Sequence, residues 1–213
     1  MNNSQLSRSC GGASGDSRRQ SVYEQATSTW RLRNSNTPGV SDLKFRFGPA
    51  PCAWKPITGD WDGDGVDTVG LYDPATGTFR LRNSNTAGVS DVKFRFGPAP
   101  CSWLPIAGDW NGDGIDTVGL YDPATGTFRL ININATAATA DLKYRFGPAP
   151  CSWLPIAGDW DSDGTETVGL YDPATDTFRL INSNVTHSVA DVKFVFGPIS
   201  GTQQPIAGDW DGM

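Results

Sequence analysis

The sequence predicts an all-β protein made of four-stranded units, and three observations lead to this prediction. A segment of about fifty residues recurs in tandem along the 213-residue chain. Glycine and proline, 25 and 15 in number, separate short apolar segments from one another. Within those segments polar and apolar side chains alternate at the period of a β-strand, and none shows the period of a helix. Tandem four-stranded repeats of this length are typical of a β-propeller.

The repeat is clearest around its acidic loop. The string GDWDGDGVDTVGLYDPATGTFRLRN begins at Gly59, and close copies begin at Gly108 and Gly158. A truncated copy, GDWDGM, begins at Gly208 and ends the chain. Three full copies and one partial copy predict four blades.

Four strands are expected in each repeat, illustrated by the copy that contains residues 105–147. The first strand (105–110) leads into the acidic loop, and the second (117–123) leaves it. A DPATG turn connects the second strand to the third (127–132), and the fourth (142–147) ends at an FGPAP break. In the third strand Phe128 and Leu130 alternate with Arg129, which indicates one buried face.

The ends of the chain predict how the propeller closes. Residues 21–34 match the second and third strands of a blade, and residues 205–210 match a first strand. We therefore expect a four-bladed propeller whose N- and C-terminal strands share one blade, which leaves no open sheet edge at the junction. An open array, or closure through oligomerisation, is the alternative.

The predicted domain limits follow from this pattern. Residues 1–20 are polar and rich in glycine and serine, and we expect a disordered leader there. The propeller is expected over residues 21–213, with repeats at about 21–58, 59–107, 108–157 and 158–213.

Composition excludes several functional classes. The net charge of −6 and the pI near 4.7 argue against nucleic acid as a partner. No apolar stretch is long enough for a membrane helix, and the chain shows no signal peptide. The single histidine, His187, excludes zinc sites built from several histidines.

The acidic loops predict calcium sites. Oxygen ligands at positions 1, 3 and 5, glycine at position 6 and a carbonyl at position 7 are what a calcium loop requires, because alternate side chains then converge on one point. The alternative is a set of surface turns in which aspartates cap the backbone. The candidate ligands are Asp60, Asp62, Asp64, the Val66 carbonyl and Asp67; Asp109, Asn111, Asp113, the Ile115 carbonyl and Asp116; Asp159, Asp161, Asp163, the Thr165 carbonyl and Glu166; and Asp209 and Asp211 in the truncated copy. We expect about three bound calcium ions, one for each full loop.

The string FRFGPAPCAWKPITGDWDGDGVDTVGLYDP resembles the FG-GAP/VCBS type of propeller repeat, known from integrin α-chains and many bacterial surface proteins. The resemblance covers roughly residues 22–212 and implies structural calcium on one rim of the propeller, at Asp60, Asp62, Asp64 and their equivalents. It also implies an extracellular or cell-surface parent protein. The family usually has an acidic ligand at position 9, where this sequence has Thr68, Thr117 and Thr167 with the acid one residue earlier.

Other repeated side chains are weaker candidates for function. Cys52, Cys101 and Cys151 share one repeat position. Three interpretations are open: they are nucleophiles, they are ligands of a soft metal, or they are small buried residues without a chemical role. Trp54, Trp103 and Trp153 lie beside them, and an exposed ring of aromatic residues can stack on sugars. His187 is a fourth catalytic candidate, in a loop that the other repeats do not match.

Two functional hypotheses follow from these residues. The first is a calcium-stabilised binding module that recognises a glycan or a protein, as a monomer or a homo-oligomer. The second is a metal-dependent hydrolase of esters or phosphotriesters, which uses an ion near the propeller tunnel or the repeated cysteines. Whether the protein is an enzyme stays open at this point, because a fold does not fix an activity.

Overall fold

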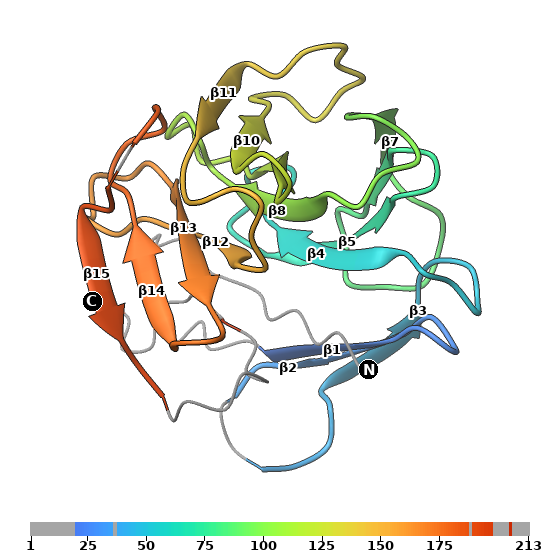
Figure 1. Cartoon of the computed structure of the whole chain (residues 1–213). Helices are drawn as coiled ribbons and strands as arrows, with labels where there is room; N and C mark the ends of the chain where they lie inside the picture. The colour runs from blue at the N-terminus through green and yellow to red at the C-terminus, as the bar shows by residue number, and fades with distance from the viewer. Residues whose placement is uncertain (1–19, 36–37, 188, 198–204, 206–213) are drawn as a thin grey trace. The chain divides into compact units, whose positions relative to one another are not determined.

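All fifteen regular elements in the described part of the chain are β-strands (Figure 1). The structure is a computed structural model, which describes residues 20–35, 38–187, 189–197 and 205. No helix in this described part is long and apolar enough to span a membrane.

The strands form four antiparallel sheets, in which strands that follow one another in sequence pair with one another. The first sheet contains β1 (Gln20–Glu24), β2 (Thr29–Arg33) and β3 (Leu43–Arg46). The second contains β4 (Lys55–Gly59), β5 (Thr68–Asp73), β6 (Thr78–Leu81) and β7 (Val92–Arg95). The third contains β8 (Leu104–Gly108), β9 (Thr117–Asp122), β10 (Thr127–Leu130) and β11 (Leu142–Arg145). The fourth contains β12 (Leu154–Gly158), β13 (Thr167–Asp172), β14 (Thr177–Leu180) and β15 (Val192–Val195).

The fold class is the predicted all-β, four-bladed β-propeller, with one sheet for each repeat. Each complete sheet begins with the strand that precedes an acidic loop, at Lys55, Leu104 and Leu154. Of the predicted closing strand at residues 205–210, only Pro205 belongs to the described residues. Residues 1–19 of the expected leader also lie outside the described residues. Strands β1–β7 lie in one compact unit and β8–β15 in a second.

An aromatic ladder crosses each complete sheet. In the third sheet Phe128 of β10 is the direct cross-strand partner of Tyr121 in β9 and of Tyr144 in β11. The ring centroids lie 4.5 and 5.9 Å apart, a separation at which aromatic pairs attract beyond simple burial. The repeat of the sequence is thus a repeat of one cross-strand packing pattern.

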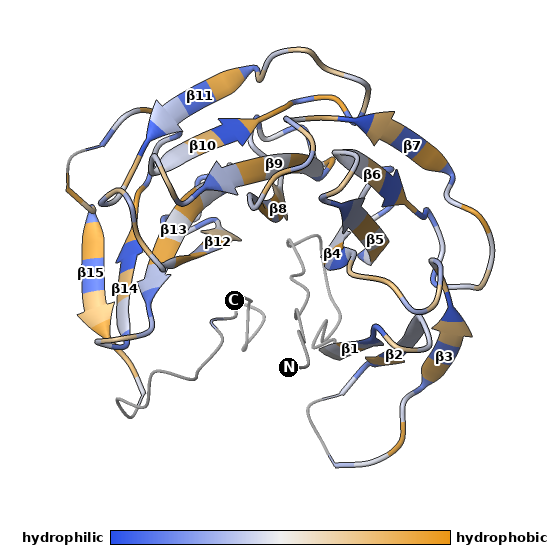
Figure 2. Cartoon of the chain, turned by 45° about the vertical axis from the view of Figure 1, so that its right-hand side comes forward, coloured by the Kyte–Doolittle hydropathy of each residue, from blue (hydrophilic) through white to orange (hydrophobic). Residues whose placement is uncertain are grey.

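The second strand of each complete blade is buried along its whole length, in β5, β9 and β13. The outer strand β7 instead alternates in hydropathy, as its colours show (Figure 2), and it buries only Phe94. In the unit of β8–β15, Tyr144 of β11 and Phe146, which follows that strand, pack in one cluster with Val168 and Leu170 of β13. Within this unit the end of the third blade therefore contacts the second strand of the fourth blade.

Candidate functional site

The first acidic loop connects β4 to β5 and gathers three carboxylates. One oxygen atom from each of Asp60, Asp62 and Asp64 lies within 4.8 Å of the others. Asp62 and Asp64 are exposed, and Asp60 is half-buried. The structure thus brings together the residues predicted at positions 1, 3 and 5 of the loop.

Backbone hydrogen bonds to Asp60 shape this loop. Its Oδ1 accepts from the amides of Gly63 at 2.8 Å and Asp64 at 3.1 Å, and its Oδ2 accepts from the amide of Gly65 at 2.7 Å. Gly65 has φ of +83°, a conformation that side chains disfavour, so glycine is needed at the turn. The capping role that was the alternative prediction is therefore present for Asp60, together with the clustering of the three acids.

The other two loops repeat this geometry. Asp109 accepts from the amides of Gly112, Asp113 and Gly114 at 2.8, 3.1 and 2.7 Å. Asp159, Asp161 and Asp163 form a second three-carboxylate cluster within 4.8 Å. The middle loop has Asn111 in place of one acid, and its Nδ2 donates to Asp113 Oδ2 at 3.0 Å.

The first loop crowds like charges on an exposed surface. The pKa of the Asp62 carboxyl is raised, first by partial desolvation and then by the negative charges of Asp64 and Asp60. Such crowding favours either a proton or a cation at the loop. Three carboxylates and a nearby backbone carbonyl are hard oxygen donors, which suit Ca²⁺.

The acid at position 8 of each loop lies apart from these clusters. Asp116 and Glu166 are 9% and 2% exposed, and neither cluster includes Asp67 or Glu166. The main-chain oxygens of Asp67, Asp116 and Glu166 accept hydrogen bonds of 2.8–2.9 Å from Asn85, Asn134 and Asn184. These asparagines were not predicted, although their repetition in the sequence was the available signal.

The threonines at position 9 have a structural role. Thr68 is buried, and its hydroxyl donates to the main-chain oxygen of Arg82 at 2.6 Å. Thr167 donates in the same way to Ile181 at 2.6 Å. Both hydroxyls therefore tie the start of the second strand to the end of the third.

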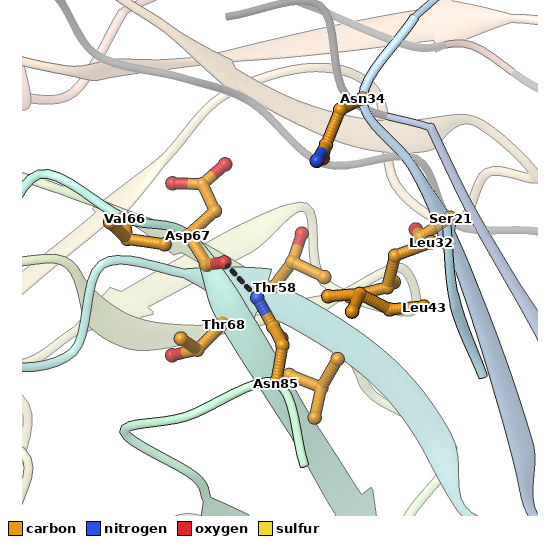
Figure 3. Close-up of a pocket in the computed structure, with 10 residues that line it drawn as sticks. Ser21, Leu32, Asn34, Leu43, Thr58, Val66, Asp67, Thr68 and Asn85 are labelled. Carbon is orange, nitrogen blue, oxygen red and sulfur yellow. Dashed lines mark hydrogen bonds between the residues drawn. The ribbon is translucent and has the colours of Figure 1, made fainter. Parts of the chain in front are cut away.

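A small cavity of about 150 Å³ lies beside the first loop (Figure 3). Its walls include the apolar side chains of Leu32 and Leu43, with Asn34 and Asp67 contributing polar groups. Ordinary small-molecule pockets have volumes of roughly 300–1,000 Å³. The cavity is therefore too small to support a catalytic assignment by itself.

Each repeated cysteine contacts a tyrosine of the blade that precedes it. The Sγ–Oη distances are 3.2 Å for Cys52–Tyr23, and 3.1 Å for both Cys101–Tyr72 and Cys151–Tyr121. Burial, and then the hydrogen bond to the thiol, raise the pKa of Tyr72 and Tyr121. The thiols thus serve as partners for buried hydroxyls, and they are half-buried where the structural alternative expected small buried residues.

The fourth blade shows a substitute for this pair. The Tyr171 hydroxyl donates to Asp176 Oδ1, and Asp176 occupies the turn position that is Gly77 and Gly126 in the two preceding blades. Burial, and then this contact, raise the pKa of Tyr171 to about 12. The tyrosine hydroxyl thus has a polar partner in every blade.

The tryptophans next to the cysteines are covered on one ring face. Arg80, Arg129 and Arg179 place their guanidinium groups 4.0–4.1 Å from the ring centroids of Trp54, Trp103 and Trp153, respectively. All three indoles are half-buried. Each can therefore offer a ligand at most its remaining face or an edge.

His187 braces the loop between β14 and β15. Its Nε2 lies 2.8 Å from Ser183 Oγ, and its Nδ1 lies 3.9 Å from Asp191 Oδ2. In the second blade Arg82 makes the corresponding contacts, to Ser84 at 2.9 Å and to Asp91 at 3.4 Å. The histidine thus replaces an arginine that the fourth blade lacks, and its serine and aspartate contacts are explained by loop structure.

No family model matches the chain, and no curated protein is significantly similar to it. The resemblance to FG-GAP/VCBS repeats therefore stays a prediction from the motif. The predicted ligands Asp209 and Asp211 lie outside the described residues.

Proposed function

We propose that the protein is a calcium-stabilised β-propeller that acts as a binding module for a glycan or a protein. The observation that supports this most is the recurrence of one acidic geometry at the same point of three blades. The acid at position 1 caps the turn, and the acid at position 5 accepts a hydrogen bond of 2.8–3.0 Å from one more backbone amide, that of Val66, Ile115 or Thr165. The additional acids at positions 3 and 5 raise the electrostatic cost of the loop, and a bound cation would remove that cost.

The donor set fits calcium better than magnesium. Asp60, Asp62 and Asp64, with the Val66 carbonyl, would hold the ion in the first loop, and the equivalent atoms would hold it in the next two. Calcium takes six to eight oxygens in flexible geometry, whereas magnesium requires a strict octahedron. Loops this exposed also fit the weaker calcium affinities of extracellular modules, so we propose a secreted or surface location.

The contacts of the repeated cysteines and of His187, the candidate catalytic residues, favour a binding role over hydrolysis. The repeated thiols pair with tyrosines, and His187 braces a loop. A binding module needs only several similar surfaces, which the repeated blades supply. The metal-dependent hydrolase remains an alternative that rests on the sequence, because none of the contacts described above supports it.

The test is calorimetric titration of the whole chain with Ca²⁺ and, separately, with Mg²⁺. We expect saturable calcium binding that weakens when Asp62 and Asp161 are both replaced by Asn, with a much smaller response to magnesium. The Asp91→Asn variant, which alters an aspartate outside the acidic loops, is the matched control. A glycan array probed with and without calcium then tests the binding role, and ester hydrolysis that a chelator abolishes would favour the alternative.

A further inference from the structure

The two compact units differ in how a junction between neighbouring blades is filled. In the unit of β8–β15, side chains of the third and fourth blades belong there to one apolar cluster, which includes Leu130, Leu142, Ala157 and Val168. In the unit of β1–β7 the equivalent residues all line the cavity of about 150 Å³ that Figure 3 shows; they are Leu32, Leu43, Thr58 and Val69. One junction is therefore packed, whereas the other holds a cavity.

The cavity also leaves a hydrogen-bond acceptor without a donor. Asn85 lines the cavity, and its Oδ1 is buried with no hydrogen-bond partner among the described residues, which costs free energy. The equivalent atom in the other unit, Asn184 Oδ1, accepts a hydrogen bond from the Tyr144 hydroxyl at 2.8 Å. The residue equivalent to Tyr144 is Phe45, which has no hydroxyl. The packed junction thus shows which chemical group fits beside this asparagine, and that group is a hydroxyl.

The walls of the cavity are mixed in polarity, and its mouth is open. Figure 3 shows Leu32 and Leu43 on one side, with Val66 and Asp67 on the other. Leu43 is 41% exposed and Asn34 is exposed, so a ligand can enter between them. Among the described residues that line the cavity, none is a lysine or an arginine that would attract an anion. A volume of about 150 Å³ accommodates one six-membered ring, so the walls suit a small uncharged ring that carries hydroxyls.

We propose that this cavity binds one neutral sugar unit at the end of a glycan. A hydroxyl of the sugar donates to Asn85 Oδ1, in the place that the Tyr144 hydroxyl takes beside Asn184. The less polar face of the sugar ring lies against Leu32 and Leu43. A water molecule would also donate to Asn85, but only a ring covers the two leucines as well. The inference rests on the proposed glycan binding and names one site for it.

The experiment measures the binding of simple sugars to the whole chain by ligand-observed NMR titration. The probes are the methyl glycosides of glucose, galactose, mannose and N-acetylglucosamine, which are all neutral. We expect at least one of them to bind saturably. If none binds, the cavity holds only water and the inference is wrong, whereas the proposed function is still decided by the calcium titration and the glycan array.

The variant Phe45→Tyr copies the residue of the third blade and places a hydroxyl beside Asn85. It should raise the thermal unfolding midpoint and weaken glycoside binding about tenfold or more, because the new hydroxyl takes the acceptor that the sugar needs. Tyr144→Phe is the matched control, since it makes the reverse change away from the cavity and should leave glycoside binding unchanged. Equal binding by the wild-type chain and Phe45→Tyr would overturn the proposal. If both chains also bind the same glycans on the array, the proposed function holds and only this site is wrong.

A second variant keeps the test valid if Phe45→Tyr fails to fold. Thr58 is half-buried and lines the cavity from β4, so Thr58→Leu fills part of the space that the sugar would occupy. We expect this variant to lose glycoside binding, whereas Thr58→Val, which keeps the shape of threonine, should retain it. A folded Thr58→Leu chain that binds glycosides as tightly as the wild-type chain would contradict the proposed site.

Discussion

The acidic loops and the linkers that carry cysteine and tryptophan both recur at fixed positions, yet they differ in how their polar groups are balanced. In a linker, the Cys151 thiol contacts the Tyr121 hydroxyl, and the Trp153 indole packs against the Arg179 guanidinium. Each of these linker side chains thus has a partner within the same chain. In an acidic loop the carboxylates at positions 1, 3 and 5 face one another. Repetition alone therefore does not identify a functional site, whereas repeated charge of one sign points to a partner from outside the chain.

The largest effect should come from a linker. Trp153→Ala removes a half-buried indole from the core cluster of β8–β15 and from Arg179. We expect a loss of about 2–4 kcal/mol in the free energy of unfolding, mainly through the cavity left behind. Denaturant unfolding measures this loss, which should be the same with calcium and with a chelator. A stable variant that loses only partner binding would show that the linker is a recognition surface instead.

A smaller effect is expected from the capping aspartate of a loop. Asp109→Ala leaves three backbone amides without their carboxylate acceptor. The loss should be about 1–3 kcal/mol even without calcium, because hydrogen bonds to a charged acceptor are lost. Asp113→Ala in the same loop is the comparison, because it removes the acceptor of only one backbone amide, that of Ile115 at 3.0 Å. It should lower calcium binding and cost the calcium-free protein less than Asp109→Ala does. Equal losses for both variants without calcium would remove the distinction between capping and ligating acids.

The smallest effect concerns charge crowding at Asp62. Because folding raises the pKa of Asp62, the native state favours its protonated form, and this contribution is lost as pH rises through the folded pKa. Asp62→Asn should therefore stabilise the calcium-free protein at neutral pH, by no more than about 1 kcal/mol at an exposed site, and the gain should vanish in acid. Thermal unfolding against pH, with chelator present, measures it. Asn111→Asp should destabilise the calcium-free protein at neutral pH, because it adds a third carboxylate to its loop. A gain in stability from this variant would contradict the effect of charge crowding.

The repeat made much of this architecture predictable. The alternation of Phe128, Arg129 and Leu130 indicated a third strand, and the structure has β10 there. The positions of Asp60, Asp62 and Asp64 predicted their convergence, because loop spacing alone fixes which side chains meet. Strand alternation and loop spacing can be predicted because each depends on only a few consecutive residues.

Contacts between distant residues were not predictable in the same way. The pairing of Cys101 with Tyr72 joins residues of a linker and a strand, and the linker is held there by the Cys101 amide, which donates to the Pro74 carbonyl at 3.1 Å. The covering of Trp54 by Arg80 likewise depends on how the linker meets the next blade. The role of Asn85 in holding the main chain of Asp67 has the same origin. Side-chain partners of this kind depend on packing, which periodicity does not encode.

The most direct test of calcium in the acidic loops is the unfolding midpoint of the whole chain in calcium and in chelator. Ligand that binds only the folded state adds about 2.7 kcal/mol of stability per site at about 100 times its Kd. We predict a higher midpoint in calcium, with the difference reduced in the Asp62→Asn, Asp161→Asn double variant and unchanged in Asp91→Asn. The same midpoint in saturating calcium and in chelator would contradict the account.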